Sequence, residues 1–240
     1  MKILEIYEYL NSLSPFEMQE SWDNSGLLVG DFDEDISTIA LSIDVDEALI
    51  DSLENNTLLI THHPIIFGGL KQLEFSKYPA NLIQKMIKKN ISNIAMHTNF
   101  DQTHLNEYVA TEVLGYKIAY KDGFVAYLEV DEDFDTFAKK VASAFGLSHA
   151  RCVKCSSRVK RVALTTGSGC SLMRSLNADC FLTGDVKYHD AMEAKSINLS
   201  LIDIGHYESE YFFAQILQKH LKNLGLKVII ASSENPFTYI

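Results

Sequence analysis

Residues 58–69 read LLITHHPIIFGG, an apolar run that ends in two adjacent histidines and a proline. The run predicts a buried strand over 57–61. Pro64 favours an extended His63 and removes a ladder donor, as expected where a strand ends. Neighbouring side chains of a strand point in opposite directions, so His62 and His63 diverge. Diverging imidazoles suit a pair of metal ions better than a single ion, provided that the rest of the chain supplies partners.

A second predicted strand, 91–96, runs into the segment MHTNFD, which carries His97 and Asp101. In open α/β sheets, ligands gather at the carboxyl ends of the strands. Residues that are far apart in the sequence are therefore expected to meet at one edge of a sheet.

A third predicted strand, 199–204, runs into GHYESE, which carries His206 and Glu210. These two residues are four apart at the start of a predicted helix, so both project from one face. Each histidine alone is more readily a structural or surface residue than a ligand, but three strand ends of this kind together predict a metal site.

Three imidazoles and two carboxylates provide five protein ligands, whereas two ions need at least about eight coordination positions. Bridging by Glu210 and by water fills part of the difference. The remaining open positions are typical of a catalytic rather than a structural site. Two divalent ions against two carboxylates leave a local positive charge that attracts phosphate or hydroxide.

The order of predicted elements indicates an α/β fold with two α/β domains and mixed, largely parallel sheets. We expect domains at 1–122 and 123–240, with the metal site between them, although the last helix and strand could pack back on the first domain. Strands are predicted at 37–44, 57–61, 91–96, 124–130, 159–166, 180–184, 199–204 and 227–232, and helices at 2–13, 46–54, 78–89, 104–114, 133–145, 171–178, 187–196 and 208–224.

Composition is that of an ordinary globular protein, with 47% hydrophobic and 22% charged residues among 240. The longest apolar runs fall short of the roughly 20 residues that span a bilayer. The N-terminal stretch carries acids in an amphipathic helix pattern and does not resemble a signal peptide. We therefore expect a cytoplasmic protein without a membrane partner. The net charge of -11 disfavours nucleic-acid binding, so a DNA-associated regulator is the weakest hypothesis.

Three further features allow two readings each. The segment CVKC places Cys152 and Cys155 at metal or redox spacing, but plain reduced thiols are favoured because no second pair completes a zinc site. Gly167 and Gly169 lie between a strand and a helix, where backbone N–H groups could hold phosphate, although a tight turn is the simpler reading. Trp22 could stack a purine, but we expect it in the core.

The segment TGDVKYHD places three more polar residues just past a predicted strand end. Lys187 or His189 could contact a phosphate or a base. Roles for Asp185, Lys187 and His189 at the surface or as helix caps are equally compatible with the pattern.

Five segments together resemble the Nif-three-like family, whose bacterial members are often described as type 2 GTP cyclohydrolase I or its homologues. They are WDNSGLLVG, THHP, NIAMHTNFD, FLTGDVKYHDAMEA and DIGHYESE. The resemblance covers nearly the whole chain and matches the short form, without the long insert between the halves. It implies two related α/β domains and a toroidal homohexamer with dinuclear sites that face an internal cavity.

The resemblance also implies the ligands of two divalent ions. His62 and His206 would bind one ion, His63 and Asp101 the other, and Glu210 both. His97 matches a histidine close to the metals, which we interpret either as a residue that supports the ligands or as a proton shuttle. Histidine with carboxylate suits zinc, iron, manganese or nickel.

The best single functional hypothesis is GTP cyclohydrolase I activity, in which GTP and water give 7,8-dihydroneopterin triphosphate and formate. Metal-bound hydroxide would attack C8 of the purine, and His97 would move protons to the ring nitrogens. Two alternatives stay open at this point: a metal-dependent phosphoesterase, and a non-catalytic metal-binding or interaction protein.

Overall fold

The computed structural model describes residues 1–231 and 233–238, and the chain divides into two compact units. Unit 1 comprises Met1–Phe100 and the C-terminal segment that begins at Phe213, whereas unit 2 comprises Asp101–Phe212. Within the described ranges, no helix has the length and apolarity needed to cross a bilayer.

The sheet of unit 1 has five strands in the order β1-β4-β3-β2-β11. β1 is antiparallel to β4, and the other pairs are parallel. Every residue of the three central strands is buried, in keeping with their apolar sequences. In chain order the strands are β1 (Gly26–Val29), β2 (Thr38–Ser42), β3 (Thr57–Thr61), β4 (Ser92–Ala95) and β11 (Lys227–Ile230).

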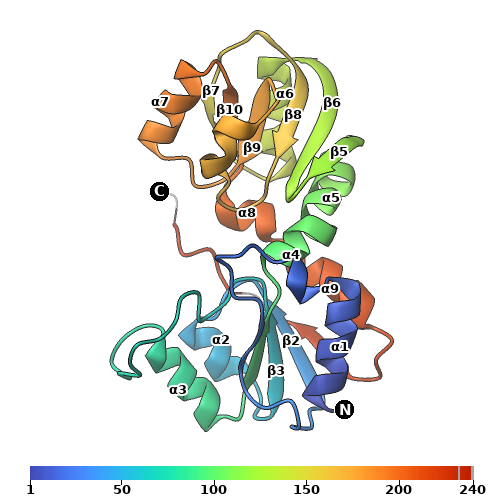
Figure 1. Cartoon of the computed structure of the whole chain (residues 1–240), viewed down its shortest axis with the longest axis vertical. Helices are drawn as coiled ribbons and strands as arrows, with labels where there is room; N and C mark the ends of the chain where they lie inside the picture. The colour runs from blue at the N-terminus through green and yellow to red at the C-terminus, as the bar shows by residue number, and fades with distance from the viewer. Residues whose placement is uncertain (232, 239–240) are drawn as a thin grey trace. The chain divides into compact units, whose positions relative to one another are not determined.

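Helices cover both faces of this sheet, with α1 and α9 on one side and α2 and α3 on the other (Figure 1). Buried aliphatic residues of β2, β3, α2 and α3 form one core cluster, which includes Ile50, Leu59 and Met86. The helices are α1 (Ile3–Leu13), the 3-10 helix Phe16–Met18, α2 (Glu47–Ser52), α3 (Ala80–Lys88), α4 (Thr98–Phe100) and α9 (Phe213–Leu221).

The sheet of unit 2 has six strands in the order β5-β6-β8-β9-β10-β7. β8, β9 and β10 run parallel, whereas the other pairs are antiparallel. In chain order the strands are β5 (Ile118–Asp122), β6 (Val125–Asp133), β7 (Arg151–Val153), β8 (Arg158–Leu164), β9 (Cys180–Thr183) and β10 (Ser200–Asp203).

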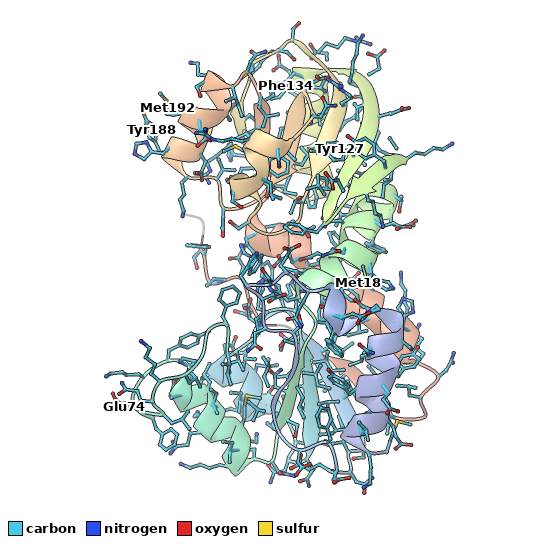
Figure 2. The ribbon with its side chains drawn as sticks, in the orientation of Figure 1. Met18, Glu74, Tyr127, Phe134, Tyr188 and Met192 are labelled. Atoms are coloured by element: carbon cyan, nitrogen blue, oxygen red, sulfur yellow. The ribbon has the colours of Figure 1, made fainter. Side chains whose placement is uncertain are left out.

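The core of unit 2 lies between this sheet and its helices. Tyr127 and Phe181 are buried with Ala194 of α7, while Tyr188 and Met192 of the same helix are exposed to solvent (Figure 2). The helices are a helical run over 101–113 with π-helical turns at Asp101–Leu105 and Val109–Val113, α5 (Asn106–Tyr108) within that run, α6 (Phe134–Ala144), the 3-10 helix Cys170–Ser175, α7 (Tyr188–Ser196) and α8 (His206–Glu210).

The expected α/β class with mixed sheets is confirmed, but several details differ. Only the sheet of unit 1 is largely parallel. The expected helix 208–224 is two helices, α8 and α9, and the expected helix 171–178 is a 3-10 helix. The expected strand 227–232 ends at Ile230, and residue 232 lies outside the described residues.

A single domain boundary near residue 123 is replaced by two crossings, after Phe100 and after Phe212. The helical run 101–113 belongs to unit 2 because it packs on β6, where the side chain of Asn106 donates to the carbonyl of Phe124 at 2.8 Å. Asp101 therefore lies in unit 2 and not in the N-terminal domain. At the other end, β11 pairs with β2, so the C-terminal segment belongs to unit 1.

We expect Gly30→Ala to lower the free energy of unfolding by about 2 kcal/mol. Gly30 has φ +117°, and a methyl group there would overlap the side chain of Ser92. Gly68→Ala is the matched control, because a methyl group on Gly68 meets nothing within 4 Å. Urea denaturation measures both variants, and equal midpoints would contradict the packing argument.

Candidate metal centre

Three histidines of unit 1 lie together at the carboxyl ends of adjacent parallel strands. His62 and His63 follow β3, and His97 follows β4. One metal-binding atom of each lies within 4.8 Å of the others. The ring centroids of His62 and His63 are 5.2 and 5.4 Å from that of His97. His62 is fully buried, whereas His63 and His97 are partly exposed.

The two histidines after β3 each donate Nδ1–H to an acceptor. Nδ1 of His62 lies 2.9 Å from the carbonyl of Met96, which can only accept, so the proton is on Nδ1. Nδ1 of His63 lies 2.7 Å from Oδ1 of Asp44. A metal-binding histidine usually gives its other ring N–H to a carbonyl or carboxylate in this manner. In a ring held in this way, Nε2 is the atom that could bind a metal.

His97 is held in place by a network of hydrogen bonds through Asp23. Its Nδ1 donates to Oδ1 of Asp23 at 2.7 Å, and the Asp23 side chain is fully buried. The backbone N–H and hydroxyl of Thr98 donate to the other carboxylate oxygen at 3.1 and 2.5 Å. Burial opposes ionisation of Asp23, but the hydrogen bonds from His97, Thr98 and Asn24 outweigh it and hold the pKa of Asp23 well below its ordinary value.

Unit 2 contains a second group, at the start of α8. Nε2 of His206 lies 3.2 Å from Oε2 of Glu210, as their spacing of four residues predicts. Nδ1 of His206 lies 2.7 Å from Oδ2 of Asp185, so this histidine repeats the arrangement seen in unit 1. Glu210 is almost completely buried. Candidate metal-binding residues thus occur in both units: three histidines in unit 1, and a histidine and a glutamate in unit 2.

Asp101 occupies the first π-helical turn of the run 101–113 and is 6% exposed. Its Oδ1 accepts from the hydroxyl of Thr166 at 3.1 Å. The next residue, Gly167, has φ +62°, and a methyl group there would overlap Oε1 of Glu210. Thr166 and Gly167 therefore connect the surroundings of Asp101 with those of Glu210 inside unit 2.

The glycine-rich turn does not provide a phosphate cradle. The N–H of Gly167 donates to the Ser209 hydroxyl at 3.0 Å, and the N–H of Gly169 donates to the Thr183 hydroxyl at 2.8 Å. Both groups are used within the chain, so the tight-turn reading holds. Beside this turn lies a cavity of about 430 Å³, lined by Ser168, Cys170, Ser171, Met173, Arg174, Asp185, Lys187, Asp190 and Glu193.

Three supporting aspartates have roles that sequence reasoning missed. The sequence pattern predicts no role for Asp44 or Asp23, and only a surface or capping role for Asp185. The N–H of Lys187 is capped instead by Asp190, at 2.9 Å. A usable signal exists, because Asp44 and Asp185 each follow a parallel strand, β2 and β9, whose neighbour ends in a histidine.

Trp22 is 54% exposed, so the expectation that it lies in the core is wrong. The polar turn that follows it is tied to its surroundings by Asp23 and by Asn24, whose side chain donates to the carbonyl of Ile66 at 2.5 Å. These hydrogen bonds fix the backbone of the turn and leave the indole at the surface.

The cysteines form no cross-link and carry free thiols. Burial is the main cause that raises the pKa of the Cys152 and Cys155 thiols, and it raises the pKa of Cys170 to about 12. A raised pKa keeps the reactive thiolate scarce at neutral pH. These properties favour the reduced-thiol reading of CVKC over a redox centre.

We expect Asp23→Asn to lower the free energy of unfolding by about 2–3 kcal/mol, because an amide nitrogen would replace an acceptor among buried donors. The control is Asp51→Asn, which removes a carboxylate only from an exposed ion pair with Lys85 and should leave stability nearly unchanged. Chemical denaturation followed by circular dichroism measures both. Equal stability of the two variants would show that the Asp23 hydrogen bonds do not anchor this turn.

Comparison with known proteins finds relatives that match the whole chain. The family model Duf34/NIF3 (NGG1p interacting factor 3) matches residues 1–236. A Campylobacter jejuni protein named GTP cyclohydrolase 1 type 2 homolog is 52% identical over 240 residues, with 100% of each chain covered. A Helicobacter pylori protein named GTP cyclohydrolase 1 type 2 is 43% identical over 240 residues, with 99% of each covered. The crystal structure of the Staphylococcus aureus hypothetical protein SA1388 has a TM-score of 0.85 at 27% identity and covers 100% of this chain and 99% of its own. This chain belongs to the Duf34/NIF3 family.

Proposed function

We propose that this protein is a metal-dependent hydrolase with GTP cyclohydrolase I activity, which acts on GTP and water to give 7,8-dihydroneopterin triphosphate and formate. The observation that carries the proposal is that four histidines make the same kind of hydrogen bond through Nδ1. His62, His63, His97 and His206 each present Nδ1 to an oxygen acceptor at 2.7–2.9 Å. That arrangement prepares Nε2 of each ring to bind a metal.

The donor set fits divalent transition ions. Imidazole nitrogens together with carboxylates suit zinc, iron, manganese or nickel. The oxygen acceptors at Nδ1 fix the tautomer and the orientation of each ring, as they usually do for metal-binding histidines. We propose that His62, His63, Asp101, His206 and Glu210 bind two such ions in a dinuclear site. When bound, the two ions would supply positive charge and lower the pKa of a bound water, so that hydroxide is available at neutral pH.

His97 has a different role in this proposal. Its ring is held by the buried Asp23 carboxylate, which accepts from Nδ1 and so fixes the ring orientation. Nε2 of His97 can then pass a proton to a purine ring nitrogen as the bonds of C8 break. Asp23 acts through His97 and positions it.

The identity of the substrate rests on the relatives. The Helicobacter pylori protein carries the name GTP cyclohydrolase 1 type 2 at 43% identity, and this supports a nucleotide substrate, with GTP as the first choice. The product separates this reaction from the phosphoesterase alternative, because ring opening releases formate whereas phosphoryl transfer releases phosphate. The homohexamer stays a prediction, which light scattering on the purified protein measures.

We expect His63→Ala and Glu210→Ala each to lose bound metal and formate production while the chain stays folded. Both residues are proposed ligands of the same pair of ions, so loss of metal in both variants supports the ligand assignment. The measurements are metal content after dialysis, formate release from GTP, and circular dichroism.

The matched control for this pair is His149→Ala, which removes an exposed histidine from unit 2. It should keep both metal and activity. Full metal content in either ligand variant would remove that residue from the site. A metal-loaded protein that releases no formate from GTP would reject the cyclohydrolase assignment and favour the non-catalytic alternative.

We expect His97→Gln to retain metal and to lower the rate of formate release by about 10²–10⁴-fold, because glutamine cannot transfer the proton. Metal content and rate are measured on the same preparation. If the variant loses metal together with activity, His97 is a ligand instead of a proton shuttle.

A further inference from the structure

Trp22 is a large apolar side chain that the fold holds at the surface. It is 54% exposed, yet the side chain of the next residue, Asp23, is fully buried and accepts hydrogen bonds from His97 and Thr98. The backbone beside Trp22 is therefore fixed by buried polar contacts. An exposed aromatic ring on such a fixed turn is typical of a contact surface.

A second exposed ring lies next to Trp22. Phe67 comes from the loop between β3 and α3 and is also 54% exposed. The ring centroids of Trp22 and Phe67 are 5.9 Å apart. Asn24 donates to the carbonyl of Ile66, so the two segments that carry these rings are linked directly.

Both rings adjoin the histidine cluster. The ring centroid of His97 lies 6.3 Å from that of Trp22 and 6.2 Å from that of Phe67, and the angles between the ring planes are 78° and 75°. The ring centroid of His97 is also 5.2 Å from that of His62 and 5.4 Å from that of His63. His97 is thus a common neighbour of the two exposed rings and of two candidate ligands, and all five residues belong to unit 1.

We infer that Trp22 and Phe67 bind the planar heteroaromatic ring of the substrate, a purine base, by stacking beside His97. The inference rests on the proposed function and extends it by assigning the base a binding surface. Aromatic side chains stack on the π-face that every base presents, and this contact needs no charge. An uncharged contact suits a protein of net charge -11, in which the base is the neutral part of an anionic nucleotide.

The test uses a property of the composition, because Trp22 is the sole tryptophan of the chain. Its fluorescence reports on this surface alone. We expect GTP to quench the emission of the purified protein in a saturable manner, after correction for absorption by the nucleotide. Inorganic tripolyphosphate, which has no ring, should leave the emission unchanged at the same concentrations.

Substitutions then test whether the two aromatic rings stack on the base of GTP or only lie near it. Phe67→Leu should raise the Kd for GTP about five- to tenfold. Trp22→Leu, followed by calorimetry, should weaken binding at least as much, and Trp22→Phe should restore part of the affinity. The matched control is Phe75→Leu. Phe75 is an exposed phenylalanine of the same loop and comes directly after Glu74, which is labelled in Figure 2. The control variant should bind GTP like the parent protein.

Three outcomes would overturn the inference. The first is emission that does not respond to GTP. The second is quenching whose midpoint is the same in Phe67→Leu and in the parent. The third is an emission maximum that shifts to the blue with protein concentration and ignores GTP, because a second copy of the chain would then cover Trp22. Saturable, Phe67-dependent quenching without formate release would support the base site while rejecting the proposed reaction, so the two failures are distinguishable.

Discussion

The candidate site depends on one constraint, which is that each imidazole gives its Nδ1–H to a fixed acceptor. Parallel strands of a sheet satisfy this constraint readily, because residues that follow adjacent strands remain neighbours. In unit 1, the backbone N–H groups of His62 and His63 bond to the carbonyls of Ser42 and Ile43, so β3 stays aligned with the chain beyond β2. That alignment brings Asp44 to His63.

Unit 2 uses the same device with different residues. β9 and β10 are adjacent and parallel, Asp185 follows the first, and His206 follows the second. In both units a carboxylate after one strand thus orients a histidine after its neighbour. Gly167, which follows β8, completes the pattern, because only a residue without a side chain allows Glu210 to approach the turn. The imidazole orientation is therefore a property of strand order as well as of the residues themselves.

This logic explains what the sequence predicted well and what it did not. The strands before His62, His97 and His206 were predicted within one or two residues, since buried strands read as apolar runs. The supporting aspartates were harder, because their importance depends on which strands are neighbours, and strand order is not visible in a periodic pattern. Asp101 was placed in the wrong domain for a related reason: a helical run contains no signal for the sheet on which it packs.

Two other differences have local physical causes. The expected helix 208–224 breaks between α8 and α9, where the chain passes from unit 2 to unit 1, and the apolar stripe of the second part begins only at Phe212. Trp22 was expected in the core because large aromatic residues are mostly buried. Here the hydrogen bonds of Asp23 and Asn24 decide the conformation of the turn, and the indole follows from it.

The pairing of β11 with β2 has a consequence for the synthesis of the chain on the ribosome. Residues 101–212, which form all of unit 2, are synthesised before Lys227–Ile230 exists. Until then, β2 presents an open edge of unpaired peptide groups, the kind of surface that recruits foreign strands. During synthesis, unit 2 can therefore be complete while unit 1 still lacks a strand, and the emergence of β11 then closes an edge that is prone to aggregation.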